Sequence, residues 1–316
     1  MLKVLVTGVT GFIGNALSKK LLEEGSIVYG LVRHTSNRYY VPEGVRVVVG
    51  DLTDPMSMER VAKTVTPDIV VHVGALTPVS LSYDMPRTYA YVNYLGTVNL
   101  AEACNKYCEN LKAFIYASTS EVYGQNDCDK LKEDEPCYPN TPYAVAKYSG
   151  ELYVRKYMVE AYDFPAFALR PFNTYGRAFV NQNHFVIEKL ITMMLEGSPV
   201  IYMGDGTAVR DFVFRDDHVN GYIRAIETAL TDIDKLQGKV FNISTGHGYT
   251  IQEVAKIIAD EIGWDGDIYW DAIIRPADIK CLIGDNSLAK KYLDWEPKYD
   301  IVSGLQKAIE EWRSVL

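Results

Sequence analysis

The N-terminal segment Lys3-Val-Leu-Val-Thr-Gly8-Val-Thr-Gly11-Phe-Ile-Gly14 decides the fold class of this chain. Its first five residues form an apolar run typical of a short buried strand. The glycines then form a turn, and residues 12–24 repeat apolar side chains at helical spacing. A strand, a glycine turn and a helix N-terminus in this order let the backbone approach a pyrophosphate closely. The segment therefore predicts a dinucleotide loop made by Gly8, Thr10, Gly11, Phe12, Ile13 and Gly14.

The glycine spacing alone is a weak signal, because G-x-x-G-x-x-G also fits a glycine turn that opens any helix. The alternation of strands and helices that follows strengthens the dinucleotide interpretation. Further apolar runs predict strands at 27–32, 45–49, 69–73, 113–117 and 166–169. Helical patterns cover 57–65, 85–108 and 142–161. Continuous apolar strands alternating with helices predict an α/β fold, a Rossmann-type doubly wound parallel sheet.

The pattern loosens after about residue 175. Helices are expected at 184–196, 216–230, 250–262 and 304–315, with short strands near 199–202 and 239–243. We expect a smaller C-terminal α/β substrate domain against the carboxyl edge of the sheet. The expected division is a dinucleotide-binding domain at 1–175, with a return segment at about 211–245, and a substrate domain at 176–210 and 246–316.

Composition narrows the possible functions. The 316 residues are 48% hydrophobic and 23% charged, as in a globular protein, and the net charge is −9. This charge argues against nucleic-acid and anionic-membrane binding, and no apolar run has transmembrane length. The chain opens without a signal-peptide pattern, and its five scattered cysteines lack a Cys-x-x-Cys pair. Reduced thiols, a cytoplasmic location and no metal site are the expectation.

Other strand ends extend the predicted cofactor site. Asp51-Leu52 and Gly74-Ala75 follow the third and fourth strands, where ligands bind in such sheets. An NAD site usually carries an acid about 20 residues past the glycine loop, but no acid lies between Glu24 and Glu43. Arg33 stands there instead, which favours the 2′-phosphate of NADP, with NAD as the alternative. The competing interpretation of Arg33 is a solvated loop cation.

A catalytic group is predicted where the fifth strand ends and the second long helix begins. Tyr143 and Lys147 are four residues apart and share one helix face, while Thr119 and Glu121 follow the strand. A phenol has a pKa near ~10, which we expect the ammonium and a nicotinamide charge to lower, making Tyr143 a usable base. Tyr-x-x-x-Lys is common by chance. Its position behind a dinucleotide loop predicts redox chemistry.

With these motifs the chain resembles the extended short-chain dehydrogenase/reductases of the sugar-nucleotide epimerase/dehydratase group, over nearly its whole length. Besides the segments above, the resemblance rests on Asn93-x-x-Gly-Thr97, Arg170-Pro-Phe-Asn173-x-Tyr-Gly176, Gly204-Asp-Gly, Arg210-Asp-Phe and Arg275-Pro-x-Asp278. It implies a nucleoside-diphosphate sugar as substrate. It also implies diphosphate contacts by Asn173, Arg210 and Arg275 and a homodimer through helices 85–108 and 142–161. Thr77, in the segment after the fourth strand, and Ser120 are further candidates for substrate contacts, with a polar loop as the alternative interpretation of Thr77.

The resemblance further implies a mechanism. Tyr143 takes the proton from the sugar 4-OH, Lys147 lowers its pKa, and Thr119 hydrogen-bonds O4, which yields a transient 4-keto sugar. Glu121 then suits a base at C5 for a 4,6-dehydration, since the Thr-Ser-Glu order is similar to GDP-mannose 4,6-dehydratases. UDP-glucose-type 4-epimerases, UDP-glucuronate decarboxylases and 4-keto-sugar reductases remain alternatives, and in an epimerase Glu121 would only cap a turn. A non-catalytic dinucleotide sensor is disfavoured, because the Tyr-Lys pair is present.

Overall fold

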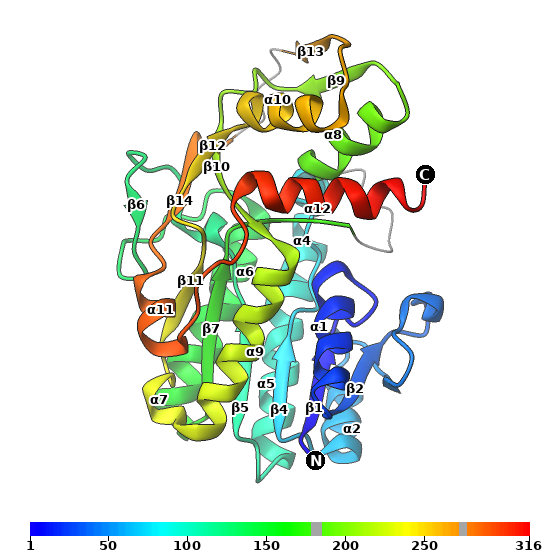
Figure 1. Cartoon of the computed structure of the whole chain (residues 1–316). Coiled ribbons are helices and arrows are strands. Elements are labelled where there is room, and N and C mark those ends of the chain that lie inside the picture. The colour runs from blue at the N-terminus through cyan, green and yellow to red at the C-terminus, as the bar shows by residue number, and fades with distance from the viewer. Residues whose placement is uncertain (178–184, 272–276) are drawn as a thin grey trace.

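The computed structural model describes residues 1–177, 185–271 and 277–316. Its centre is a seven-stranded, all-parallel sheet in the order β11-β7-β5-β4-β1-β2-β3 (Figure 1). The strands are β1 (Lys3–Thr7), β2 (Ile27–Val32), β3 (Arg46–Val49), β4 (Ile69–His72), β5 (Ala113–Ala117), β7 (Ala166–Pro171) and β11 (Val240–Ile243). The strand order reverses between β1 and β4, so their carboxyl ends open the crevice where such sheets bind ligands. The predicted α/β class is confirmed.

Helices cover both faces of this sheet and bury its apolar side chains in two cores. One face carries α1, α9 and α11, and the other carries α2, α5, α6 and η4. Trp295, buried with the first face, donates its indole N–H to the carbonyl of Asp217. The bounds are α1 (Phe12–Glu23), α2 (Pro55–Val65), α5 (Gly96–Tyr107), α6 (Pro142–Leu152), η4 (Tyr153–Met158), α9 (Arg215–Thr231) and α11 (Ser287–Leu293).

The two long predicted helices exist as composite helices. The first runs through α4 (Pro86–Tyr89), η2 (Ala90–Leu95) and α5, and the second through α6, η4 and α7 (Val159–Tyr162). Each contains a π-helical stretch, η2 in the first and η4 in the second. A shorter helix, α3 (Val79–Asp84), precedes the first of them. The amphipathic pattern predicted their extent but not the wider turns within them.

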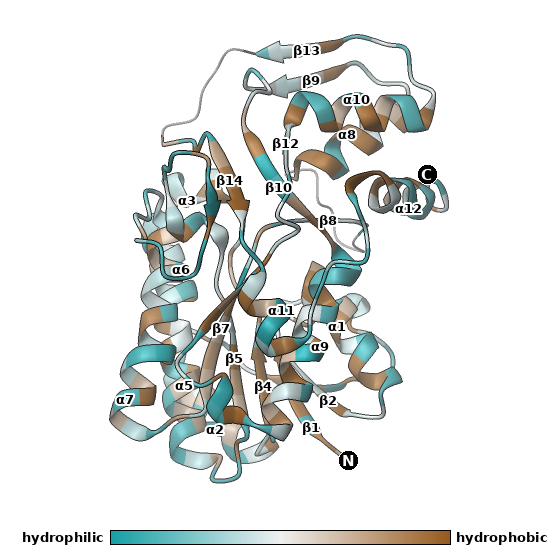
Figure 2. Ribbon diagram, turned by 60° about the vertical axis from the view of Figure 1, so that its left-hand side comes forward, coloured by the Kyte–Doolittle hydropathy of each residue, from teal (hydrophilic) through white to brown (hydrophobic). Residues whose placement is uncertain are grey.

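A second, smaller part of the chain lies beyond the carboxyl ends of the parallel strands (Figures 1 and 2). Its own core joins α8, α10 and α12 to β10. The strands are β6 (Lys130–Leu131), β8 (Asn173–Tyr175), β9 (Val200–Met203), β10 (Val209–Phe214), β12 (Gly248–Thr250), β13 (Ile268–Asp271) and β14 (Cys281–Gly284). The helices are α8 (Val186–Leu195), α10 (Ile251–Ile262) and α12 (Ile301–Arg313). Short 3₁₀ turns are η1 (Arg38–Tyr40), η3 (Ser120–Tyr123) and η5 (Ile233–Lys235).

The chain crosses between the two parts more than once. After β10 it returns to the parallel sheet as α9, which packs on α1, and as β11, the edge strand next to β7. The exact domain boundaries remain a prediction. Among the described residues, no helix is both long and apolar enough to cross a membrane.

The expectation of reduced thiols throughout is wrong for one pair. Cys128 and Cys281 form a disulfide, with their Cα atoms 5.2 Å apart. The two cysteines are 153 positions apart, so no local spacing in the sequence predicts the bond. The parallel pairing of β14 with β6, two residues after Cys128, brings them together. Cys104, Cys108 and Cys137 are free thiols.

Candidate active site

The glycine loop has the geometry of an anion cradle. Gly8 lies in the left-handed region with φ +68°, and a Cβ atom on Gly14 would stand only 2.2 Å from the Gly8 carbonyl oxygen. The N-cap of α1 is Gly11, which supplies no side-chain cap, and the first helical turn carries no acid. The amide groups of this turn, which includes Phe12 and Ile13, therefore suit the pyrophosphate of a dinucleotide.

The end of β4 forms the floor beside this loop. A Cβ atom on Gly8 would lie 2.8 Å from the Cα atom of Gly74, so small residues are needed on both strands. Gly74 donates its N–H to the Thr7 hydroxyl at 2.8 Å, and the same hydroxyl pairs with His72 at 2.7 Å. Burial lowers the pKa of His72 to about 3, so this ring is neutral. Ala75 follows in the chain and completes the small-residue floor.

The ends of β2 and β3 bring Arg33 and Asp51 together. Asp51 is partly buried, but hydrogen bonds from the Thr53 N–H and hydroxyl outweigh this desolvation and lower its pKa, with a smaller contribution from the Arg33 charge. Leu52 is held through its carbonyl, which accepts a bond from Asn99 at 2.8 Å. Arg33 itself is exposed. The structure therefore places all three predicted residues at one corner of the crevice.

The four predicted catalytic residues converge at the end of β5. The Thr141 hydroxyl caps α6, which sets Tyr143 in the first turn and Lys147 one turn later. The ammonium of Lys147 lies 4.4 Å from the ring centre of Tyr116. Thr119 caps η3 by accepting the N–H of Glu121 at 3.2 Å.

Burial dominates the electrostatics of this group. It raises the pKa of the Tyr143 phenol; a hydrogen bond with Thr119 opposes this rise, and the charge of Glu121 adds to it. Burial also lowers the pKa of Lys147 to about 7, with the Glu151 charge opposing. The expectation that the ammonium lowers the phenol pKa is therefore not met by the protein alone, because both groups are desolvated together.

A cavity of about 370 Å³ opens above these groups, between the two parts of the chain. Glu121 and Thr141 line it from the catalytic side, and Thr77 lines it from the segment after β4. Across the cavity stand Asn173, with a buried amide oxygen, and Arg210, whose guanidinium is 3.4 Å from Asp278. Thus Thr77, Glu121, Asn173 and Arg210 share one cavity, as a substrate site requires.

Two predicted substrate residues do not join this set. Ser120 is buried in η3, only 3% exposed, and is absent from the cavity wall, because the 3₁₀ turn aims neighbouring side chains in different directions. Arg275 lies outside the described residues. Sequence reasoning also missed Glu188, Lys189 and Tyr202, which line the cavity. Helical periodicity could not identify them, since their place in the wall depends on how α8 and β9 pack.

Glu188 is a buried carboxyl group of this wall that supports a pH prediction. It accepts the Gly176 N–H at 3.0 Å, and burial raises its pKa to about 8 from an ordinary 4.5. The folded state therefore keeps a proton that the unfolded chain loses above pH ~4.5, and stability falls as the pH rises from there toward about 8. We expect Glu188→Gln to be more stable than the parent at pH 8, by on the order of 4 kcal/mol, and similar to it at pH 4.5.

Denaturant unfolding between pH 4.5 and 8.5 measures this difference. Glu196→Gln is the matched control, because Glu196 follows the same helix but is exposed. A parent and Glu188→Gln variant whose stabilities stay parallel across this range would contradict the expectation.

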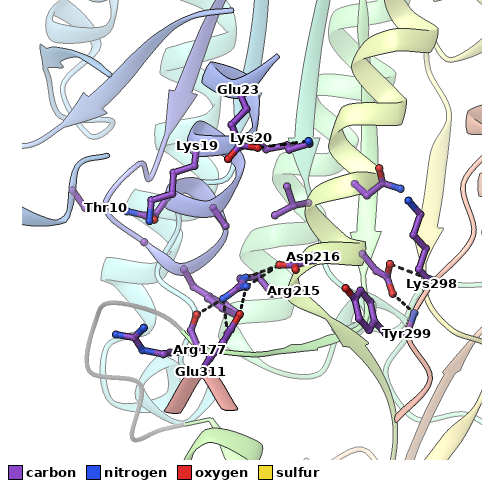
Figure 3. A pocket seen from close by; sticks show the side chains of 17 residues that line it. Thr10, Lys19, Lys20, Glu23, Arg177, Arg215, Asp216, Lys298, Tyr299 and Glu311 are labelled. Carbon is purple, nitrogen blue, oxygen red and sulfur yellow. Dashed lines mark hydrogen bonds and ion pairs between the residues drawn. The ribbon is translucent and has the colours of Figure 1, made fainter. Parts of the chain in front are cut away.

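A larger cavity, about 540 Å³, lies behind the glycine loop, between α1, α9 and the end of α12 (Figure 3). Its centre is Arg215, which pairs with Asp216 and with Glu311, both at 2.8 Å. Lys307 also contacts Asp216, at 2.9 Å. These pairs fasten α12 to the start of α9. The cavity holds charges of both signs and none of the four catalytic groups, and Thr10, Gly11 and Phe12 of the glycine loop form part of its wall.

No group of three metal-binding side chains occurs within the described ranges. Known proteins match this chain in sequence and in fold. Residues 5–308 match the family model described as GDP-mannose 4,6 dehydratase. GDP-mannose 4,6-dehydratase of Yersinia enterocolitica is 30% identical, over 95% of this chain and 91% of that protein.

Two solved structures are also similar. UDP-glucose 4-epimerase of Thermotoga maritima with UDP-glucose superposes with a TM-score of 0.92, at 32% identity and 99% coverage of both chains. UDP-glucose 4-epimerase of Thermus thermophilus in complex with NAD has a TM-score of 0.88, at 28% identity and 100% coverage of both. Since the family model spans residues 5–308 of 316, the chain belongs to the extended short-chain dehydrogenase/reductase family of NAD(P)-dependent sugar-nucleotide epimerases and dehydratases.

Proposed function

We propose that this enzyme oxidises a nucleoside-diphosphate sugar at C4 and then removes water across C5 and C6, as a GDP-mannose 4,6-dehydratase does. The observation that carries the proposal is the position of Glu121. Its carboxylate belongs to the cavity wall and acts electrostatically on the Tyr143 phenol. A carboxylate beside the phenolic base can serve a second proton transfer.

In the first step Tyr143 accepts the proton of the sugar 4-OH while Thr119 hydrogen-bonds the same oxygen. A nicotinamide dinucleotide held by Gly8, Gly11 and Gly14 would take up the C4 hydride and supply it again for C6. Lys147 stabilises the phenolate, since it stands one helical turn from Tyr143 in the same buried site. A positive nicotinamide adds a second charge that favours the phenolate. The product of this step is a 4-keto sugar.

The ketone acidifies the proton at C5, and Glu121 takes it. The C6 hydroxyl group leaves as water with a proton from Glu121, which forms a C5–C6 double bond. The hydride then returns to C6, and the proton held by Tyr143 is delivered to C5. All atoms balance to a 4-keto-6-deoxy sugar plus water, with the cofactor restored.

Glu121→Gln tests this role. We expect the variant to lose solvent exchange of the C5 proton, and to lose dehydration by about 10²–10⁴-fold, while cofactor reduction persists. Deuterium incorporation by NMR and absorbance of the reduced nicotinamide report the two steps. Glu135→Gln, at an exposed carboxylate after β6, is the control. Full turnover by Glu121→Gln would refute the assignment.

A 4-epimerase is the second candidate, and the likeness to the epimerase structure favours it. In that case Glu121 only supports the η3 turn. Mass spectrometry of products from GDP-mannose, dTDP-glucose, UDP-glucose and UDP-glucuronate separates the reactions. Loss of water identifies a dehydratase, no change in mass an epimerase, and loss of carbon dioxide a decarboxylase. Net consumption of free cofactor identifies a 4-keto-sugar reductase.

We further propose NADP as the preferred form of the cofactor. Arg33 stands at the end of β2, where its guanidinium can pair with a 2′-phosphate, and no acid occupies this stretch. We expect Arg33→Ala to weaken NADP binding relative to NAD by about 10–100-fold, the worth of a charge-assisted hydrogen bond. Fluorescence titration with both cofactors measures this ratio. Arg46→Ala, at the start of neighbouring β3, should leave it unchanged.

Two broader properties belong to the same proposal. Exposed Tyr91, Leu95, Val145 and Tyr157 on the composite helices support a homodimer through these helices. A cytoplasmic location stays a prediction, and the Cys128–Cys281 disulfide counts against it, because such bonds are rare in reducing compartments.

A further inference from the structure

The Cys128–Cys281 disulfide joins two segments that both contribute to the substrate cavity. The first begins at Glu121 in η3 and continues through the loop to Cys128. The second comprises Ala277, Asp278 and Ile279 of the cavity wall and leads directly to Cys281. The bond is therefore seven residues from the proposed C5 base and three residues from the acid that pairs with Arg210.

Side chains of the first segment form hydrogen bonds with the backbone of the second. The amide of Gln125 donates to the Asp278 carbonyl and accepts the N–H of Lys280 at 3.3 Å. Asn126 donates to the Cys281 carbonyl at 2.7 Å and also accepts the Cys128 N–H at 2.9 Å. The three contacts between the segments depend on the two staying in register, which the covalent bond supports, while the Asn126–Cys128 hydrogen bond lies within the first segment.

The loop itself is held in a demanding conformation. Cys128 has φ +71°, a left-handed value that side-chain-bearing residues seldom adopt. Gly124 has φ +66°, and a Cβ atom there would meet the Tyr138 carbonyl oxygen at 2.0 Å. Without the disulfide, Cys128 can leave the left-handed region, and its N–H would then no longer hold the Asn126 amide that donates to the second segment.

We propose that the disulfide is a redox-sensitive clamp that positions the Glu121 and Asp278 walls of the substrate cavity, so that reduction weakens binding of the nucleotide sugar. The inference rests on the proposed role of this cavity in substrate binding. Cys128 and Cys281 are positioning residues, because neither lines the cavity. Their effect passes through the backbone to Glu121, Asp278 and Arg210.

The chemistry of release is an ordinary thiol–disulfide exchange with a dithiol. A thiolate of the reductant attacks a clamp sulfur, the sulfur–sulfur bond breaks, and the second thiol of the reductant displaces the mixed disulfide. The two cysteines gain two electrons and two protons and become thiols, while the dithiol becomes a disulfide. Cys128 is the accessible target, since it is exposed whereas Cys281 is only 2% exposed.

The test compares oxidised and dithiothreitol-reduced enzyme, with the thiol state read by mass spectrometry. We expect reduction to raise KM for the nucleotide sugar, and Kd for its parent nucleotide (UDP, GDP or dTDP by calorimetry), about tenfold. Reoxidation restores both constants. Bound nucleotide should also disfavour reduction by the same factor, because coupling is reciprocal.

Variants distinguish an effect on the geometry of the substrate cavity from an effect on the stability of the whole protein. Cys128→Ala/Cys281→Ala should match the reduced enzyme and ignore dithiothreitol, whereas Cys137→Ser, which changes a free thiol, should behave as the parent. If the double variant does not fold, the reduced parent provides the same comparison. A fall in Tm on reduction with KM and Kd unchanged overturns the clamp, as does an air-oxidised enzyme without the bond.

Failure of the proposed function gives a different result. If none of UDP, GDP and dTDP binds in either redox state, the nucleotide-sugar assignment fails, while the clamp is still decided by hydrogen exchange. Faster exchange in residues 121–126 and 277–281 on reduction then supports a clamp on these walls. Unchanged exchange in both segments overturns it.

Discussion

Tyr143→Phe is expected to lower kcat by about 10²–10⁴-fold while leaving nucleotide binding within a few-fold of the parent. The phenol oxygen is the only atom removed, and in the proposed first step it alone accepts the 4-OH proton. Thr119 can hydrogen-bond the sugar oxygen but has no accessible pKa for this role. Single-turnover reduction of the cofactor measures the step directly, and calorimetry with UDP or GDP measures binding.

Two variants place limits on this result. Tyr148→Phe removes the hydroxyl of another tyrosine on α6 and should leave kcat unchanged. Lys147→Met should approach the loss seen for Tyr143→Phe, because a buried phenolate without a nearby cation is strongly disfavoured. Turnover of Tyr143→Phe near the parent rate would show that another group takes the 4-OH proton, and the mechanism would have to be rebuilt around Glu121.

The first part of the fold was predictable because its signals are local. Each strand of the parallel sheet corresponds to one apolar run in the sequence. Gly8 and Gly14 indicate a turn that has no room for a side chain. Tyr143 and Lys147 share a helix face through spacing alone. These features can be predicted without knowing any contact between residues that are distant in the sequence.

The second part depends on pairings that sequence spacing does not encode. Glu188 is a cavity residue only because α8 packs under β10 and beside the Gly176 amide. Asp278 meets Arg210, 68 positions away, through a crossing of the chain between its two parts. Cys128 and Cys281 likewise meet through the pairing of β6 with β14. Burial also depends on distant contacts, and it is the main cause of the raised pKa of the Tyr143 phenol, which helical spacing could not show.

The second large effect concerns stability and is expected from Arg170→Met. Arg170 is 1% exposed and forms a bidentate pair with Glu151 at 2.7 and 2.9 Å. Glu151 also accepts the Ser118 hydroxyl at 2.6 Å, directly before Thr119, and its charge acts on Lys147. Removing Arg170 takes two charge-assisted hydrogen bonds from the buried carboxylate of Glu151, whose ion pair with Arg155 at 2.8 Å remains, so we expect the free energy of unfolding to fall by about 3–5 kcal/mol.

Denaturant unfolding of a double-mutant cycle tests whether the stability loss comes from the charge of Glu151. Arg170→Met/Glu151→Leu removes both charges and should recover part of the loss, because the penalty lies in the buried carboxylate that has lost Arg170, while Arg155, 12% exposed, loses its own pair with Glu151 in this variant. Lys20→Met, which breaks exposed pairs with Glu23 and Glu24 at 3.6 Å, should cost less than about 1 kcal/mol. The guanidinium carbon of Arg170 lies 4.8 Å from the ring centre of Tyr123. A double variant as unstable as the sum of its singles would mean that Arg170 stabilises the fold through this packing and not by neutralising Glu151.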